Sequence, residues 1–217
     1  MTKLDKIARL AEKADAKSAK RARKKDELAD NAIAALKQLG YARTSLRDIA
    51  ELSGVAVGTL HYYFEDKVDL ITYCVRRYKT GFMADMQSIL SGDVAPDQLA
   101  ARLVKGLALS IRRDAETHRL WYDIRSQALF DAAFNDVVEE IEDGLVRLVS
   151  VFLSRTGHTD VEPGSAYLML DAIFRFHLQK FLSGSTSAPA GFEQQASEIL
   201  AIITSASKGS APGRADV

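Results

Sequence analysis

The densest group of chemically active side chains lies near the N-terminus, where basic residues gather in a short run. Lys20, Arg21, Arg23, Lys24 and Lys25 are nearly contiguous, and the first 25 residues carry ten basic side chains against three acidic ones. A basic cluster at one end of a chain attracts phosphates or anionic lipid. The alternative is a solvated tail without a partner, because composition alone supplies no recognition geometry.

Other reactive residues form no known catalytic or metal-binding motif. The chain contains no Gly-x-Ser-x-Gly, no phosphate-binding loop and no paired metal motif. Asp114 and His118 stand four residues apart, but a metal site needs two further ligands. Cys74 is the only cysteine, so the chain suits a reducing compartment. The sequence predicts no enzyme activity, no cofactor and no bound metal.

Composition predicts an all-α fold in two unequal domains. The 217 residues are 47% hydrophobic and include only four prolines and 13 glycines, which disfavours a turn-rich β-sandwich or barrel. The net charge is zero, but residues 1–80 carry 17 basic against 11 acidic side chains and residues 81–217 carry 12 against 18. No apolar stretch is long enough to span a bilayer, and the N-terminus lacks the apolar core of a signal peptide. We therefore expect a soluble, cytoplasmic protein.

Three short helices are predicted between residues 24 and 64. Apolar residues at helical spacing indicate a helix over 24–39, which Gly40 ends, and a looser helix over 3–20. Ser45 with Asp48 predicts the cap of a second helix that buries Leu46, Ile49 and Leu52. A turn containing Gly54 leads to a third helix over 57–64. Two short helices joined by such a turn are typical of a helix-turn-helix, whose second helix enters the DNA major groove.

The run from Gly40 to Ile71, GYARTSLRDIAELSGVAVGTLHYYFEDKVDLI, resembles the N-terminal domain of the tetracycline-repressor (TetR) family of transcriptional regulators. The resemblance covers about 45 residues and rests on a glycine–aromatic pair, a Thr-Ser pair, Arg-Asp-Ile-Ala, Gly-Val, and a Leu-x-Tyr-Tyr-Phe run followed by Lys and Leu. Two positions depart from the family pattern: Ala56 replaces the usual Ser, and His61 replaces the usual Tyr. Both positions face DNA in the family, so operator preference does not carry across.

The resemblance implies a DNA-contacting set on the second and third helices and their flanks. In the family these positions contact phosphates or bases, and Gly58 lets the backbone approach DNA closely. The alternative for Tyr62, Tyr63 and Lys67 is packing within the small domain. The predicted DNA-binding residues are Arg23, Lys24, Thr44, Arg47, Gly58, Thr59, His61, Tyr62, Tyr63 and Lys67, with Arg21 and Lys25 in the same basic arm.

Beyond this domain the pattern predicts a succession of longer helices. A helix from Lys67 to about Leu90 is followed by helices over 97–113, 115–130, 134–156, 163–183 and 192–205. With the N-terminal helices this makes about nine. The expected domains are a basic arm (1–23), a helix-turn-helix domain (24–70), a helical ligand-binding and dimerisation domain (71–205) and a flexible tail (206–217).

The family resemblance implies that the C-terminal domain binds a small ligand and dimerises through its last two long helices. Aromatic bulk with a few polar groups predicts a pocket; its candidate residues are Trp121, Tyr122, Arg125, Phe130, Phe134, Phe174, Arg175 and His177. The alternative is that these rings are ordinary core. The candidate dimer residues are Tyr167, Phe174, Phe181, Phe192, Ala196, Ile199 and Ile203, and a monomer that buries the same residues internally is the alternative.

The resulting expectation is a homodimeric regulator that binds double-stranded DNA and is released from a palindromic operator by a small-molecule effector, most simply a repressor. Two other readings remain open. One is a dimeric DNA-binding protein without an effector, for which a completely filled C-terminal core is expected. The other is a helical carrier or enzyme, which the missing catalytic motifs disfavour.

Overall fold

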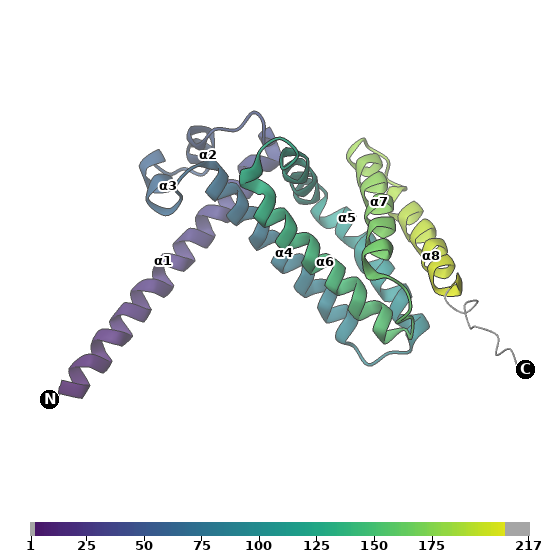
Figure 1. Ribbon diagram of the computed structural model, residues 1–217. Helices are drawn as coiled ribbons and strands as arrows, with labels where there is room; N and C mark the ends of the chain where they lie inside the picture. Colours follow the sequence, from purple (N-terminus) through teal and green to yellow (C-terminus); the bar gives the residue numbers. More distant parts are fainter. Residues whose placement is uncertain (1–2, 207–217) are drawn as a thin grey trace, which may run out of the picture. The chain divides into compact units, whose positions relative to one another are not determined.

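The computed structural model describes residues 3–206, and this part of the chain contains eight α-helices, one short 3-10 helix and no strand. The all-α prediction is confirmed (Figure 1). The chain divides into two compact units, residues 1–75 and 76–217, and the boundary falls inside one long helix. Among the described residues no helix has the length and apolar character needed to cross a membrane.

Helix α1 runs without interruption from Lys3 to Leu39. The expectation of separate helices over 3–20 and 24–39 is therefore wrong. The segment contains no glycine or proline and is rich in Ala, Lys and Leu, all good helix formers, so nothing breaks the helix between the two parts. Gly40 then adopts a φ of +75°, and this left-handed residue ends the helix as predicted.

Helices α2 (Leu46–Leu52) and α3 (Val57–Tyr63) form the predicted pair. The Ser45 hydroxyl accepts from the Asp48 amide at 3.2 Å, and an Asp48 carboxylate oxygen accepts from the Ser45 amide at 2.7 Å, a reciprocal cap. Gly54 has a φ of +64° in the turn. Ile49 and Leu60 are fully buried, but half of the Leu52 surface is exposed, which corrects the expected burial of Leu52.

Helix α4 (Lys67–Ser91) begins where predicted, because an Asp66 carboxylate oxygen accepts from the Asp69 amide at 2.8 Å. Helix α5 spans Pro96–Gln127 without a gap. The predicted break near residue 114 is present only as a kink: Asp114 has φ −124° and ψ 20°, and the helix continues beyond it. No glycine or proline stands at the kink, so helical hydrogen bonding resumes on its far side.

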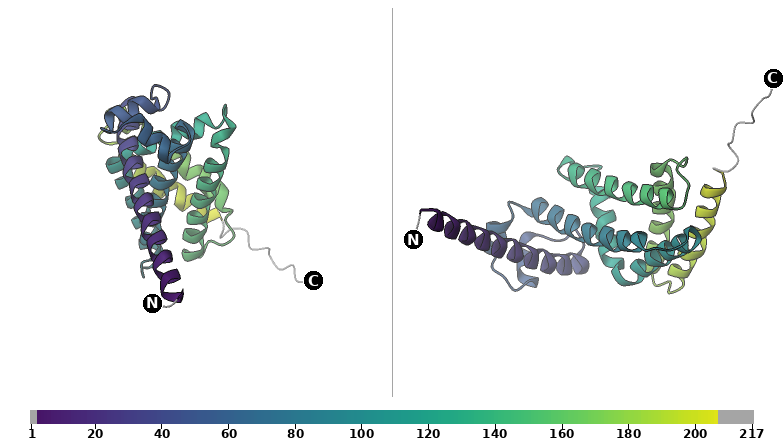
Figure 2. Two further views of the ribbon diagram at one scale, coloured as in Figure 1. Left: turned by 90° about the vertical axis from the view of Figure 1, so that its left-hand side faces the viewer. Right: turned by 90° about the horizontal axis from the view of Figure 1, so that it is seen from below.

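The C-terminal half consists of a 3-10 turn η1 (Ala132–Phe134) followed by α6 (Asn135–Arg155), α7 (Pro163–Leu182) and α8 (Ala188–Ala206). Pro163 stands in the first turn of α7, and Gly157 and Gly184 adopt positive φ after α6 and α7, as predicted. Helix α8 begins four residues before the expected position, and the predicted tail from residue 207 onward lies outside the described residues. Helix α7 packs against α5, α6 and α8, and α8 also packs against α5 (Figure 2).

Candidate nucleic-acid interface and ligand cavity

The outer surface of α3 combines an uncovered backbone with exposed rings. Gly58 is exposed, and a Cβ placed on it would meet no atom within 4 Å. His61 is exposed, and Tyr62 exposes 66% of its surface. Thr59 and Tyr63 are half-buried, whereas Leu60 anchors the opposite face in the core. The helix therefore presents a short polar and aromatic surface that is open at Gly58.

The rings on this surface are positioned by one another and by α1. Tyr62 and Tyr63 contact edge to face with ring centroids 4.9 Å apart, and the Arg21 guanidinium lies 5.5 Å from the Tyr62 ring centre. Arg47 is exposed on α2. These cations and rings all belong to the first unit, and their arrangement suits contacts with phosphates and base edges.

Thr44 has a structural partner. Its side chain is buried, and its hydroxyl donates a hydrogen bond to the Gly40 carbonyl. The hydroxyl thus ties the end of α1 to the start of α2, and the DNA contact that the resemblance implies for Thr44 stays a prediction. A sequence pattern does not distinguish these two uses of a threonine before a helix.

Lys67 is also tied to the domain. Its ammonium donates to the Tyr41 carbonyl at 2.8 Å and lies 4.2 Å from the centre of the Tyr41 ring. Burial lowers the pKa of Lys67, and the nearby Asp48 carboxylate partly opposes this shift. Lys67 thus fixes the loop after α1 to the start of α4, as its packing alternative foresaw.

The basic arm is a helical surface. Residues 12–23 of α1 are all exposed, including Arg23. Lys24 pairs with Glu27 at 2.7 Å on the surface. Lys25, by contrast, lies 4.7 Å from the centre of the Phe64 ring and 4.4 Å from that of Tyr73, so it packs within the domain.

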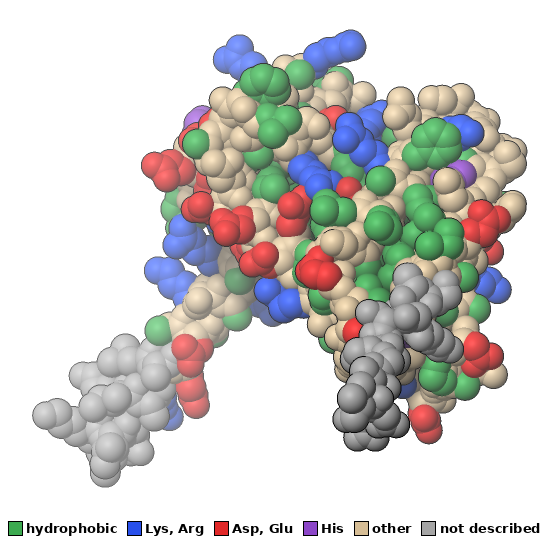
Figure 3. All heavy atoms as spheres, turned by 45° about the vertical axis from the view of Figure 1, so that its right-hand side comes forward, with side chains coloured by type: hydrophobic (Ala, Val, Ile, Leu, Met, Phe, Trp, Pro, Cys, Tyr) green, Lys and Arg blue, Asp and Glu red, His purple; other side chains and the backbone are tan. Residues whose placement is uncertain are grey.

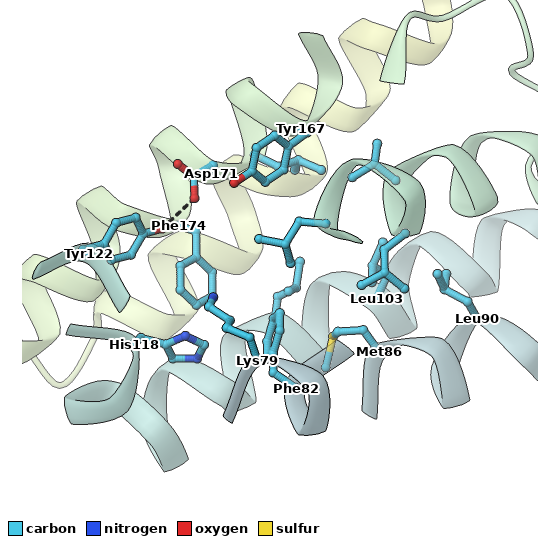
Figure 4. A pocket seen from close by; sticks show the side chains of 15 residues that line it. Lys79, Phe82, Met86, Leu90, Leu103, His118, Tyr122, Tyr167, Asp171 and Phe174 are labelled. Carbon is cyan, nitrogen blue, oxygen red and sulfur yellow. Dashed lines mark hydrogen bonds between the residues drawn. The ribbon is translucent and has the colours of Figure 1, made fainter. Parts of the chain in front are cut away.

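The second unit contains a cavity of about 90 Å³ bounded by α4, α5, α6 and α7 (Figure 4). One end carries polar groups and the other end is apolar. In Figure 4, Lys79, His118, Tyr122 and Asp171 lie toward one end, and Leu90 lies at the other. The full lining is Lys79, Phe82, Met86, Leu90, Leu103, Leu107, His118, Tyr122, Leu145, Leu148, Val149, Tyr167, Leu170, Asp171 and Phe174.

The structure brings only some of the predicted pocket residues to this cavity. Tyr122 and Phe174 line it, and so does Tyr167, which was expected at the dimer interface. Trp121 is buried beside the Lys79 ammonium, Phe134 is buried in the core and Phe130 exposes 87% of its surface, and none of the three lines the cavity. Phe130 follows the end of α5, where the chain turns outward.

The remaining predicted pocket residues, Arg125, Arg175 and His177, do not line the cavity either. Arg125 pairs with Glu142 and with Asp171, each at 2.5 Å. The Arg175 guanidinium lies 5.5 Å from the Tyr122 ring centre on the outer side, and His177 contacts the Gln195 side chain of α8 at 2.9 Å. Arg125 therefore pairs with carboxylates of α6 and α7.

The sequence analysis missed Lys79, the buried cation of the cavity. It exposes 3% of its surface, and its ammonium lies 5.0 Å from the centre of the Phe82 ring and 4.9 Å from that of Trp121. Burial lowers the pKa of Lys79 to about 7, an effect that Asp171 partly opposes. The available signal was helical spacing: Val75, Lys79, Phe82 and Met86 share one face of α4, so a lysine stands on an apolar face.

His118 forms a buried polar chain beside Lys79. The Ser110 hydroxyl donates to the Leu107 carbonyl at 2.8 Å, so His118 Nε2, 3.1 Å from the same oxygen, donates to it. His118 Nδ1 then accepts from the Tyr78 hydroxyl at 2.8 Å. Burial, with Lys79 and Arg113 nearby, lowers the pKa of His118 well below its usual value, so the ring is neutral. The described residues include no group of three or more side chains suited to hold a metal ion.

The expected dimer residues are mostly internal to the protomer. Phe192 and Ala196 are fully buried, and Phe181, Ile199 and Ile203 are half-buried. A different set of apolar residues is exposed on the same helices: Leu168, Met169 and Phe176 on α7 and Ile202 on α8. Figure 3, which turns α7 and α8 toward the viewer, shows hydrophobic side chains gathered over these helices.

The chain is similar in sequence to known transcriptional regulators. Residues 28–74 match the family model described as bacterial regulatory proteins, tetR family. An uncharacterised HTH-type transcriptional regulator of Mycobacterium tuberculosis is 27% identical over 133 residues, which cover 61% of this chain and 54% of that protein. The match thus spans about half the length of this relative.

Solved structures share the fold over most of the chain. A TetR transcription regulator from Haloarcula marismortui aligns with a TM-score of 0.72 and 20% identity, covering 84% of this chain and 98% of that one. The regulator FadR from Bacillus subtilis, in complex with stearoyl-CoA, aligns with a TM-score of 0.65 and 16% identity, covering 82% and 97%. Residues 28–74 thus match the tetR family of bacterial regulatory proteins, and the helical fold of the whole chain is similar to that of solved TetR-family regulators.

Proposed function

We propose that this protein is a DNA-binding transcriptional regulator that acts in the cytoplasm as a ligand-responsive repressor. The observation that carries the proposal is the outer surface of α3, where Gly58 leaves the backbone uncovered beside the exposed His61 and Tyr62. A helix of two turns offers few side chains to base edges, so close approach of its backbone is what makes those contacts possible. The proposal assigns no catalytic reaction to the chain.

A homodimer is part of the proposal. One two-turn helix contacts too few base pairs for operator specificity, whereas two copies on a palindromic site double the contacts. The exposed apolar residues of α7 and α8 supply a surface for the second copy, and a contact across a twofold axis buries the same residues from both partners.

The effector site is proposed to be the cavity between α4 and α7. An open cavity favours a ligand-responsive regulator over an effector-independent one, for which a filled core was expected. FadR from Bacillus subtilis, which shares the fold, is described in complex with stearoyl-CoA. Helix α4 begins at Lys67, directly after the helix-turn-helix, and carries the cavity residue Lys79. A ligand that displaces α4 is therefore expected to change the affinity for DNA.

The test begins with selection of bound duplexes from a random-sequence pool, followed by affinity measurements on the enriched sequence. The expected result is a twofold-symmetric sequence, bound about 10³-fold or more tightly than a scrambled duplex. His61→Ala and Tyr62→Ala are expected to weaken specific binding without unfolding the domain, because both side chains are exposed. If no sequence is enriched, or both variants bind like the wild type, the proposed role of α3 is wrong.

A further inference from the structure

Two hydrogen-bond donors at the cavity have no protein partner. Within the described part of the chain, the Lys79 ammonium contacts only aromatic rings, those of Tyr78, Phe82 and Trp121. The Tyr167 hydroxyl is also buried at the cavity without a hydrogen-bond partner. A buried donor that is left unpaired costs free energy, so such groups in a lined cavity indicate a ligand with acceptor atoms.

The nearby carboxylates are occupied by other groups. Asp171 accepts from the Tyr122 hydroxyl at 2.8 Å and pairs with Arg125 at 2.5 Å. Arg125 also pairs with Glu142. The one guanidinium and the two carboxylates thus form their own network, and neither carboxylate lies within ion-pair distance of Lys79. The cation that is left available to a ligand is Lys79.

The opposite end of the cavity has no polar side chain among its lining residues. Met86, Leu90 and Leu103 lie there, and the other lining side chains that Figure 4 does not label, Leu107, Leu145, Leu148, Val149 and Leu170, are also apolar. Figure 4 shows Met86, Leu103 and Leu90 extending away from the end that holds Lys79 and His118. A ligand that fills both ends therefore has an acceptor group at one end and an apolar tail at the other.

We infer that the effector is a small monocarboxylate with an apolar tail, whose carboxylate accepts hydrogen bonds from the Lys79 ammonium and the Tyr167 hydroxyl. This inference rests on the proposed effector site and names its ligand class. A carboxylate offers two oxygens, one for each unpaired donor, and it neutralises a cation that is otherwise buried among rings. The apolar tail displaces water from the leucine-lined end.

The proposal carries a pH dependence. The groups that face Lys79 are Asp171 and Tyr167 of α7, His118 and Arg125 of α5, Glu142 of α6 and its own neighbour Tyr78. A bound carboxylate raises the pKa of Lys79, which burial holds near 7 in the free protein. Carboxylate affinity therefore falls as the pH rises above about 7, by up to about tenfold per pH unit, because binding then requires proton uptake.

The experiment uses the full-length protein and its single tryptophan. Trp121 lies beside the Lys79 ammonium, so its fluorescence reports occupation of the cavity directly and without DNA. Octanoate is titrated against methyl octanoate and octylamine, which keep the tail and change the head group. The variants are Lys79→Met, Tyr167→Phe and, as a matched control, Lys105→Met, which removes an exposed lysine of α5.

The expected result is that the wild type and Lys105→Met bind octanoate about tenfold or more tightly than methyl octanoate, a preference that disappears in Lys79→Met and falls several-fold in Tyr167→Phe. The decline of octanoate affinity between pH 7 and 9 is also expected to vanish in Lys79→Met. The inference is overturned if octanoate does not bind, if the ester or amine binds as well, or if Lys79→Met retains the octanoate preference.

The same titrations separate this inference from the proposed function. If the protein binds a selected duplex and methyl octanoate or octylamine releases it while octanoate does not, the regulator stands and the carboxylate is wrong. If octanoate fills the cavity with the predicted Lys79 dependence but no duplex is ever bound, the ligand class stands and the regulatory function fails.

Discussion

Two exposed helical glycines have similar surroundings, but only Gly58 is proposed to lie against DNA. Gly58 in α3 and Gly81 in α4 are both exposed, and a methyl group on either would meet no atom within 4 Å. In a helix, replacing glycine by alanine lowers the backbone entropy of the unfolded chain without a steric cost at such a site. The two positions therefore isolate the effect of a single methyl group on DNA binding.

Gly58→Ala is expected to stabilise the protein by about 0.5–1 kcal/mol and at the same time to weaken DNA binding about tenfold or more, because the methyl group occupies the space through which the duplex approaches. Chemical denaturation and fluorescence anisotropy with a labelled duplex measure the two effects. Gly81→Ala is the control and should give the stability gain alone. Unchanged DNA affinity in Gly58→Ala would show that the α3 backbone does not approach the duplex.

Lys79 makes stability depend on pH with a definite sign. Its pKa is about 7 in the folded protein and 10.5 in an exposed lysine, so between these values the unfolded chain binds the proton and the folded chain does not. The folded state therefore loses stability as the pH falls from about 10.5 toward 7.

Lys79→Met removes this loss. Its stability advantage over the wild type should grow by about 3 kcal/mol between pH 10 and pH 7, measured by urea unfolding at both values. An advantage that does not change with pH would mean that Lys79 titrates normally in the folded protein, and with it the argument for a desolvated ammonium would fail.

What the sequence predicts at single residues depends on how local the cause is. The Ser45–Asp48 cap and the positive φ of Gly40, Gly54, Gly157 and Gly184 involve only neighbouring residues, and their places in the sequence indicated them. The partner of Lys67 is the Tyr41 carbonyl, 26 residues earlier in the chain, so the sequence pattern left its role open. Thr44 bonds to the Gly40 carbonyl four residues earlier, a use that a threonine before a helix does not reveal by its place alone. The burial of Lys79 was not predicted, because the rings around its ammonium come from two helices, α4 and α5.

At the scale of whole helices, the spacing of apolar residues located the helices but did not show where one helix continues into the next. The ends of α4 and α7 were predicted to within a residue or two because Asp66, Pro163 and Gly184 mark them. The continuity of α1 and of α5 beyond Asp114 was missed, since a charged stretch without glycine or proline gives no local sign of where one helix ends and another begins. The cavity was located only to its helices, because its lining depends on how they rotate against one another.

The exposed part of α1 is expected to strengthen DNA binding without selecting a sequence. Deleting residues 1–20 removes six basic and three acidic side chains. If the deleted segment makes about one phosphate contact in each chain of a dimer, the slope of log affinity against log salt should become shallower by about 2, since each contact contributes about 0.9. Affinity measured from low to physiological salt gives the slope.

A second variant, which removes charges but keeps the helix, separates the electrostatic effect of the deletion from the loss of part of α1. Changing Lys13, Lys17 and Lys20 together to Gln keeps α1 and removes three cations from its exposed surface. This variant should flatten the slope in the same direction as the deletion. A slope equal to that of the wild type in both variants would assign the basic cluster to solvent rather than to phosphate.

At the scale of the whole molecule, the exposed apolar residues of α7 predict self-association. Leu168 and Phe176 expose 58% and 50% of their surfaces on one helix, and grouped exposure of this kind marks an interface. Leu168→Glu is expected to convert a dimer into monomers and to weaken operator binding at the same time, because a buried unpaired charge costs several kcal/mol. Sedimentation at micromolar concentration measures the first effect.

The control for this prediction is Leu129→Glu, which changes an even more exposed leucine outside α7. It should leave the dimer and DNA affinity intact. Dissociation by both variants would indicate that neither reports on a specific interface, and a wild-type protein that sediments as a monomer would refute the α7 surface outright.

The central claim is that two copies of α3 contact two half-sites of one duplex, and footprinting on a selected duplex, with the bound stoichiometry measured in parallel, tests it most directly. We expect two chains per duplex and two protected major-groove segments on one face, with centres about 34–36 Å apart or a multiple of one turn. A single protected segment held by one chain, or uniform protection that ignores sequence, would contradict it.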